Sequence, residues 1–470
     1  MRKDIYHIPA RLQQHISSEQ AFHYRIVPVD EKNETLILKT DTTALQGLFT
    51  ELNIVLDKPV LLEHCKTEEL QKYLTTNYRQ HVTKVGSSIG YTSDFLEKIL
   101  LSAKNIGSSD IHFEPYEEHC RIRFRLDGKL VEQYTIPIQD YPIMVNKIKV
   151  RAKLDIAEKR LPQDGRITLK SGENEFDIRV SSLPTLHGEK LVLRILSRDT
   201  SKVELSKLGF SEEELKRYKE GLKKPNGIIL ISGPTGSGKT TTLYATLKLL
   251  NQPDTNVLTI EDPIEYTLEG INQVQLKENI GLDFASSLRT FLRQDPDIIM
   301  VGEIRDVKTA NMAIRAALTG HLVLSTIHTN SAWATISRLV DMGVPPFLIA
   351  STLNMSVAQR LVRKLCDSCK LEVSIDKELF PNRFQIPKSL KKHFVATGCD
   401  ACHHTGYFGR KAIYEILPIT KELSSPIREN HLEINDYLSD NKISTLKTNA
   451  IYMVQQGVTS IEEVYALLTN

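Results

Sequence analysis

The segment GPTGSGKT, Gly233–Thr240, is a complete match to the pattern Gly-x-x-x-x-Gly-Lys-Ser/Thr and decides the fold of this chain. The apolar run GIILIS (227–232) leads into it, and the helix-forming run TTTLYATLKLL (240–250) follows. In such a strand–loop–helix, backbone N–H groups turn inward around phosphates and the helix N-terminus adds positive potential. We expect Lys239 to reach the β- and γ-phosphates of a nucleotide and the Thr240 hydroxyl to bind Mg²⁺. The expected nucleotide-binding residues are Gly233, Pro234, Thr235, Gly236, Ser237, Gly238, Lys239, Thr240 and Thr241.

Apolar runs alternate with helical stretches on both sides of the loop. The runs are GIILIS, NVLTIE, PDIIMVG and HLVLSTIH. This alternation predicts a parallel sheet covered by helices on both faces, within a domain that spans 211–470. A helix is expected to open it, because Ser211 and Glu214 have capping-box spacing. The last hundred residues are expected to be mostly helical, interrupted by a cysteine-rich stretch.

Four side chains at predicted strand ends are candidates for catalysis. Glu303 ends the strand of PDIIMVGEIRD, and the position before it, where many related enzymes carry an aspartate, is Gly302. Glu261 lies in the acidic cluster TIEDPIEY, and His321 and His328 open and close the run HLVLSTIH. Ligands bind at the carboxyl ends of strands in open α/β sheets, which favours a shared site. The alternatives are a solvated glutamate, a turn that needs only its Asp-Pro step, and packed or surface histidines.

The residues before the sheet divide into two further units. Residues 1–80 combine short strand-like runs with helical stretches, which predicts a small α+β domain. The Gly/Ser-containing segment 81–91 is a predicted linker. Residues 92–197 begin with a helical stretch and continue as alternating strands separated by DG, SG and HG, which predicts an antiparallel sheet with a helix against it. A hinge is expected at 198–210.

The composition excludes several classes of protein. The chain has 470 residues, 41% of them hydrophobic and 25% charged, with a formal net charge of +2. These values are typical of a soluble globular protein. The small net charge gives no overall electrostatic attraction to nucleic acid or to an anionic membrane. No apolar run is long enough for a membrane-spanning helix, and the N-terminus lacks the apolar core of a secretory signal. Six cysteines are too few for a disulfide scaffold, so a reducing compartment is expected.

Four of those cysteines form two Cys-x-x-Cys pairs inside 364–404. Cys366 and Cys369 belong to KLCDSCK, and Cys399 and Cys402 belong to GCDACHHTGY. Four thiolates suit tetrahedral Zn²⁺ and leave no open position for catalysis, which favours a structural site over a catalytic zinc, a redox couple or a nucleic-acid-binding knuckle. The 29 residues between the pairs are expected to form a helix-containing flap.

Several motifs in order resemble the secretion ATPase superfamily of type II secretion and type IV pilus assembly. TIEDPIEY resembles the family's Asp box, VGEIRD its atypical Walker B motif and TGHLVLSTIHTN its His box. SDIHFEP, RFRLDG, RLPQDGRI and RVSSLPTLHGEKLVLRIL resemble its second N-terminal domain, and YFGRKAIYEIL also fits. The resemblance covers residues 90–470.

The resemblance implies a RecA-like phosphate-loop ATPase domain, a PAS-like α+β middle domain, a small N-terminal domain and a tetracysteine zinc subdomain. It implies ATP, Mg²⁺ and Zn²⁺ as ligands, and Glu303 as the catalytic glutamate. Arg179 and Arg194 match the family's arginine fingers, which stabilise charge on a transferring phosphoryl group.

The resemblance also implies a homohexamer that drives pilus or pseudopilus assembly at the cytoplasmic face of the inner membrane. Its partners would be a membrane platform protein and the cytoplasmic domain of a membrane adaptor, with membrane contact only through them and no nucleic acid. The tetracysteine stretch is typical of assembly motors and not of retraction motors. A nucleic-acid translocase and a nucleotide-gated scaffold without turnover stay as alternatives, and the motifs do not separate secretion, pilus and competence systems.

Overall fold

The computed structural model describes residues 6, 8–32, 35–42, 45–56, 58–78, 89–171, 174–196, 204–431 and 433–469. Most of the predicted linker 81–91 and the first half of the predicted hinge 198–210 lie outside these residues. The chain divides into two compact units, and each is described by itself. Unit 1 comprises Met1–Thr200, Arg363–Gly409 and Gly457–Glu462; unit 2 comprises Ser201–Val362, Arg410–Gln456 and Glu463–Asn470.

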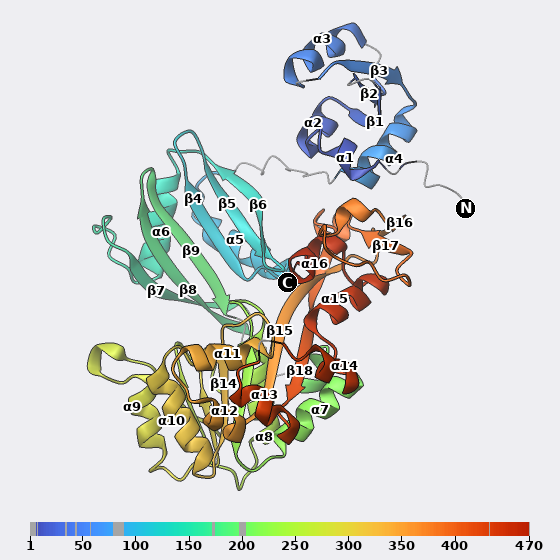
Figure 1. Cartoon of the computed structure of the whole chain (residues 1–470). Coiled ribbons are helices and arrows are strands. Elements are labelled where there is room, and N and C mark those ends of the chain that lie inside the picture. Colours follow the sequence, from blue (N-terminus) through green and yellow to red (C-terminus); the bar gives the residue numbers. More distant parts are fainter. Residues whose placement is uncertain are drawn as a thin grey trace. The chain divides into compact units, whose positions relative to one another are not determined.

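The N-terminal part of unit 1 is a small α+β fold (Figure 1). Its three strands lie in the order β1-β2-β3, with β1 antiparallel and β3 parallel to β2. Apolar side chains of the strands and helices, among them Leu38, Leu52 and Leu74, are fully buried between them. The elements are β1 (Ile26–Lys32), β2 (Thr35–Thr40), β3 (Val60–His64), α1 (Ala10–Gln13), α2 (Ser18–His23), α3 (Leu45–Val55) and α4 (Thr67–Asn77).

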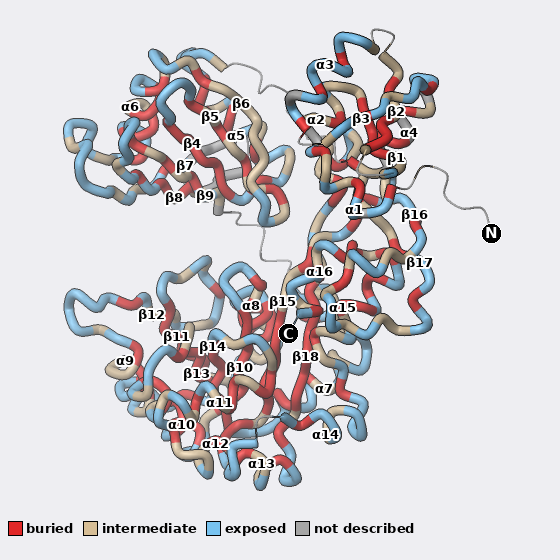
Figure 2. Tube along the Cα trace, turned by 45° about the horizontal axis from the view of Figure 1, so that its top comes forward, coloured by how far each residue is buried: buried red, intermediate tan, exposed pale blue. Residues whose placement is uncertain are grey.

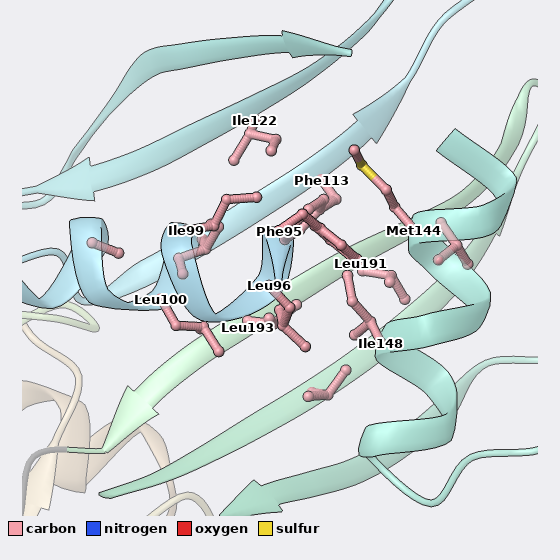
Figure 3. Packing of buried hydrophobic residues seen from close by; sticks show 14 of the residues in the cluster. Phe95, Leu96, Ile99, Leu100, Phe113, Ile122, Met144, Ile148, Leu191 and Leu193 are labelled. Atoms are coloured by element: carbon pink, nitrogen blue, oxygen red, sulfur yellow. The ribbon is translucent and has the colours of Figure 1, made fainter. Parts of the chain in front are cut away.

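The middle part of unit 1 is a six-stranded antiparallel sheet in the order β6-β5-β4-β9-β8-β7. Helices α5 and α6 pack their apolar side chains against it, and Figure 3 shows Phe95 and Ile99 of α5 and Met144 of α6 meeting Phe113 and Leu191 of the strands. The predicted antiparallel sheet with a helix against it is present. The elements are α5 (Phe95–Asn105), β4 (Asp110–Pro115), β5 (Cys120–Leu126), β6 (Lys129–Ile136), α6 (Tyr141–Arg151), β7 (Gln163–Ser171), β8 (Asn174–Thr185) and β9 (Gly188–Leu196).

Unit 2 is built on a seven-stranded sheet in the order β12-β11-β13-β14-β10-β15-β18. Strand β10 runs parallel to both of its neighbours, and β13 runs parallel to β11 and β14. Every residue of β10, β11, β13 and β14 is buried, as the continuous red trace in Figure 2 shows. Strands that are buried along their whole length need cover on both faces, which explains why these runs do not alternate between apolar and polar residues. The mixed α/β class predicted from the sequence is confirmed.

The strands of this sheet are β10 (Gly227–Ser232), β11 (Val257–Glu261), β12 (Asn272–Gln275), β13 (Ile298–Val301), β14 (Leu322–Ile327), β15 (Leu353–Leu365) and β18 (Tyr407–Pro418). The helices of the same part of the chain are α7 (Glu212–Leu222), α8 (Lys239–Leu250), α9 (Phe284–Phe291), α10 (Val307–Leu318), α11 (Ala334–Asp341), α12 (Pro346–Thr352), α13 (Ser424–Arg428), α14 (Asn435–Asp440), α15 (Leu446–Gln455) and α16 (Ile461–Leu468). The predicted capping box at the start of α7 is present, because Ser211 and Glu214 each bond the other's backbone N–H.

Two expectations about the last third of the chain were wrong. The long strand β18 interrupts the expected helices of the last hundred residues, because its pairing with β15 completes the sheet. Between the cysteine pairs, the flap has no α-helix. It contains β16 (Leu371–Ser374) and β17 (Lys392–Val395), an antiparallel pair, and one short 3-10 turn. Tertiary pairing therefore overrides the local helix preference of these segments.

In the part of the chain that the structure describes, the helices are too short or too polar to cross a bilayer.

Candidate active site

The predicted phosphate loop lies between the end of β10 at Ser232 and the start of α8 at Lys239. Gly238, the residue before the helix, has φ +88°, a left-handed conformation that favours glycine. A Cβ on Gly233 would come within 2.5 Å of the backbone oxygen of Gln359, so this position has no room for a side chain. The glycines of the motif therefore serve a tight turn against a neighbouring strand.

The Lys239 side chain is buried within the loop. Its ammonium donates hydrogen bonds to the backbone oxygens of Gly233 at 2.9 Å and Pro234 at 3.1 Å. Burial lowers the pKa of Lys239, and the nearby Glu303 carboxylate partly offsets this effect. Ser237 has a buried hydroxyl without a hydrogen-bond partner in the described structure. A buried cation and an unsatisfied hydroxyl in one loop fit an anion that supplies acceptor oxygens.

The other predicted loop residues are accessible. Pro234, Thr235 and Gly236 are exposed at the tip of the loop, and Thr240 and Thr241 are exposed on the first turn of α8. Thr240 is thus accessible at the start of α8, and the binding of Mg²⁺ by its hydroxyl stays a prediction.

Glu303 follows β13 at the carboxyl edge of the sheet, and its side chain is 14% exposed. One carboxylate oxygen lies 2.6 Å from Arg305, and the other lies 3.4 Å from Nε2 of His328, which follows the neighbouring strand β14. That second oxygen is buried and accepts no hydrogen bond within the described residues. The structure therefore brings Glu303 and His328 together and leaves one carboxylate oxygen able to accept a proton or a water molecule.

Glu261 ends β11 at the same edge of the sheet but has a different environment. Its buried carboxylate accepts hydrogen bonds from Thr259 at 2.6 Å, from Gln273 at 3.1 Å and from the Tyr244 hydroxyl. Burial, together with the bond to Glu261, raises the pKa of Tyr244 well above its usual value. These bonds tie β11 to α8 and β12, so the observed contacts of Glu261 are those of a structural network.

His321 lies at the opposite edge of the sheet from His328. It precedes β14, whereas His328 follows it, and the strand between them spans roughly 20 Å. Its Nδ1 is 2.8 Å from the backbone oxygen of Ala316 at the end of α10. The structure does not bring His321 together with Lys239 and Glu303.

The two predicted arginines of the middle domain are neighbours. Arg179 on β8 and Arg194 on β9 are directly paired across the strands, and Arg166 on β7 pairs with Arg179 in turn. Directly paired residues share one face of the sheet. Arg194 donates a 2.8 Å hydrogen bond to Asp110 of β4. Arg166 was not among the residues predicted from the sequence, and its place beside Arg179 follows from the pairing of β7 with β8.

The four predicted zinc ligands form one cluster in unit 1. Their sulfur atoms all lie within 4.8 Å of one another, and those of Cys366 and Cys399, Cys369 and Cys402, and Cys399 and Cys402 are 3.8 Å apart. A tetrahedral zinc ion with Zn–S distances of about 2.3 Å separates its sulfurs by about 3.8 Å, so the cluster fits that ion.

The elements on either side of the flap build this cluster. Cys366 and Cys369 follow β15, and Cys399 and Cys402 lie in the turn before β18. The backbone N–H groups of Cys399 and Gly406 donate to the Cys402 sulfur at 3.2 Å, as donors around a thiolate would. Within the described residues, the group that could hold a metal ion here consists of the four cysteines and includes neither His403 nor His404.

Fold and site together define a phosphate-loop protein with a glutamate at the carboxyl end of β13, which β14 separates from the phosphate-loop strand β10. The chain belongs to the type II/IV secretion system protein family, which matches residues 87–466.

Curated relatives support the same family. The type IV pilus assembly ATPase PilB of Pseudomonas aeruginosa is 48% identical over 375 residues, which cover 79% of this chain and 66% of that protein. The chain thus matches just under two thirds of that relative's length. The type II secretion system protein E of Dickeya dadantii is 41% identical over 454 residues and 90% of each chain.

Solved structures share the fold. The pilus retraction motor PilT with bound ADP matches with a TM-score of 0.52 at 26% identity, over 78% of this chain and 95% of that one. The ATPase DotB of Legionella pneumophila matches with a TM-score of 0.61 at 22% identity, over 82% of this chain and 97% of that one.

Proposed function

We propose that this protein is an ATPase motor that drives assembly of a type IV pilus or a secretion pseudopilus. The proposal rests on the Lys239 ammonium, which is buried within the phosphate loop and hydrogen-bonded to the backbone oxygen of Gly233. The Glu303 carboxylate attracts this ammonium and partly offsets the effect of burial on its pKa. Relatives named as a pilus assembly ATPase and as secretion system proteins support the proposal.

Lys239, Thr240 and Glu303 have distinct roles in ATP hydrolysis. Lys239 exchanges its bonds to loop oxygens for bonds to the β- and γ-phosphates and neutralises their charge. Thr240, which is exposed, would hold Mg²⁺ through its hydroxyl, and the ion would supply further charge neutralisation. The free oxygen of Glu303 accepts a proton from the attacking water, and the bond from the water oxygen to the γ-phosphorus forms as the β–γ bridge breaks.

We infer that two arginines of the middle domain would supply positive charge to this reaction. Arg179 and Arg194 stand side by side on one face of its sheet, and a guanidinium placed on a transferring phosphoryl group increases turnover by about 10³–10⁵-fold. ATP-dependent docking of this face and its release after hydrolysis would make domain rotation the motor's output. A ring of six subunits would pass that motion to a membrane platform protein, with an adaptor holding the motor at the cytoplasmic face of the inner membrane.

The four cysteines would bind one structural zinc ion per subunit. Their four sulfurs would fill every position of a tetrahedral ion and leave no site for substrate. Its role is to clamp the end of β15 to the start of β18.

Measurement of phosphate release by the full chain, with and without single- and double-stranded DNA, tests the function. Turnover of Mg-ATP that DNA leaves unchanged supports the motor. Turnover that rises severalfold with DNA supports a translocase, and ATP binding without turnover, even with a platform protein present, supports a scaffold.

A further inference from the structure

Strand β15 extends past its neighbour β10 and runs beside the phosphate loop. The last paired residues are Ser232 of β10 and Ala358 of β15. The loop begins at Gly233, and β15 continues with Gln359 and Arg360. Two polar residues more than a hundred positions from the motif therefore line the loop.

Gln359 fixes this strand against the loop. Its buried side chain accepts a 2.9 Å hydrogen bond from the Thr242 hydroxyl on α8. A Cβ on Gly238 would lie 2.9 Å from its amide nitrogen, so the two segments are in close contact. The backbone at the next residue is consequently held at a defined distance from the loop.

The Arg360 guanidinium lies beside Gly233, the first residue of the phosphate loop. A Cβ on Gly233 would lie 3.1 Å from one terminal nitrogen, which donates to the Gln359 backbone oxygen at 3.0 Å. The other terminal nitrogen donates to the Asn330 backbone oxygen at 3.1 Å and lies 3.5 Å from that of Thr329. Arg360 thus joins the phosphate loop to the segment that directly follows His328.

This guanidinium is a partly buried cation whose hydrogen bonds go to neutral oxygens. No carboxylate of the described residues lies within 4.0 Å of it. Glu415 attracts it from further away, but its two oxygens already accept bonds from the backbone N–H groups of Ala332 and Leu446. Burial lowers the pKa of Arg360, and its charge contributes to the lowered pKa of Lys239.

Two cations, Lys239 and Arg360, therefore lie at one loop, and the Glu303 carboxylate only partly offsets the lowered pKa of Lys239. The positive charge of each side chain makes the charged form of the other less favourable, and a bound anion would offset this repulsion. Arginine suits such a place, because its planar group can donate to several acceptors at once.

We propose that Arg360 is a positioning residue of the nucleotide site, which adds a second positive charge at the phosphate loop and holds the Thr329–Asn330 segment, and with it His328, in register with the bound phosphates. The inference rests on the proposed ATPase function. It assigns a role within one subunit to a residue outside the recognised motifs.

The test compares Arg360→Met, which removes charge and hydrogen bonds, with Arg360→Lys, which keeps the charge. Arg363→Met is the matched control, because Arg363 lies on the same strand and stacks on the Tyr407 ring at 3.9 Å. Mg-ADP affinity is measured by calorimetry, ATP turnover by phosphate release, and folding by thermal unfolding of each full-length variant.

Loss of hydrogen bonds to a charged group predicts that Arg360→Met weakens Mg-ADP binding by about ten- to hundredfold. Arg360→Lys should bind Mg-ADP within about threefold of the wild type but turn over at least about tenfold more slowly, because an ammonium cannot span both carbonyl groups. Arg363→Met should match the wild type in both.

Wild-type affinity and turnover in Arg360→Met would overturn the inference, as would equal losses in both Arg360 variants, which indicate packing alone. Wild-type protein that lacks turnover would refute the proposed function. If Arg360→Met then still weakens Mg-ADP binding and Arg360→Lys does not, the charge assignment at the loop stands.

Discussion

Glu114 of the middle domain offers a stability prediction that follows directly from its contacts. Its side chain is 3% exposed on β4, and Arg123 donates to both carboxylate oxygens at 2.7 and 2.8 Å. Arg121 lies at 3.1 Å and Lys190 at 3.0 Å. Burial alone would raise the pKa of Glu114, but these cations outweigh it and lower the pKa to about 2.

The size of the effect follows from linkage between pKa and folding. A carboxyl group that titrates at about 2 when folded and near 4.5 when unfolded contributes about 3 kcal/mol at neutral pH, at about 1.4 kcal/mol per unit. Because the folded pKa is depressed, this stability is complete above the unfolded pKa and is lost as pH falls toward the folded pKa. The contribution of Glu114 to stability falls to half at about pH 3. Glu114→Gln should therefore destabilise the middle domain by about 3 kcal/mol at pH 7 and by clearly less at pH 3.

The assay is urea unfolding of the full chain, followed by pulsed hydrogen exchange of peptides from β4 and β5. Hydrogen exchange in these peptides reports unfolding of the middle domain independently of unfolding in the other parts of the chain. Glu117→Gln, at an exposed position three residues along, is the control and should match the wild type. Equal midpoints for Glu114→Gln and the wild type at pH 7, or a difference that stays constant down to pH 3, would refute the reasoning.

Three further predictions concern the proposed motor. Glu303→Gln should lower turnover by about 10²–10⁴-fold and leave Mg-ATP affinity within about threefold, since it removes the proton acceptor and keeps the shape; turnover near the wild-type value counts against Glu303 as the base. Arg194→Ala should reduce turnover by at least about 10³-fold with little effect on Mg-ATP affinity, and unchanged turnover removes Arg194 from the mechanism. Cys366→Ser should release the zinc, detected by metal analysis, and lower the thermal unfolding temperature before it lowers turnover; wild-type protein without zinc contradicts that prediction.

Local pattern was enough to predict the phosphate loop and the cysteine cluster. The motif Gly233–Thr240 carries its own turn glycines between an apolar run and a helix former, so strand, loop and helix follow from neighbouring residues. The two Cys-x-x-Cys pairs likewise define a tetrahedral donor set before any fold is known. Both predictions depend on the spacing of residues within short motifs.

Contacts between distant segments were harder to predict. The role of Arg360 depends on β15 pairing with β10, a contact between segments more than a hundred residues apart. His321 and His328 are close in the sequence, but they lie at opposite ends of β14. Glu261 looked like a site residue by its position, yet Tyr244, Thr259 and Gln273 occupy its carboxylate. In each case the partner comes from another element of the sheet.

Turnover of Mg-ATP by the full-length protein and its Lys239→Ala variant tests the central claim most directly. The account predicts phosphate release by the wild type and a loss of at least about 10²-fold in the variant, because the buried ammonium that neutralises the phosphates is gone. Hydrolysis at the wild-type rate by a folded Lys239→Ala variant would contradict it.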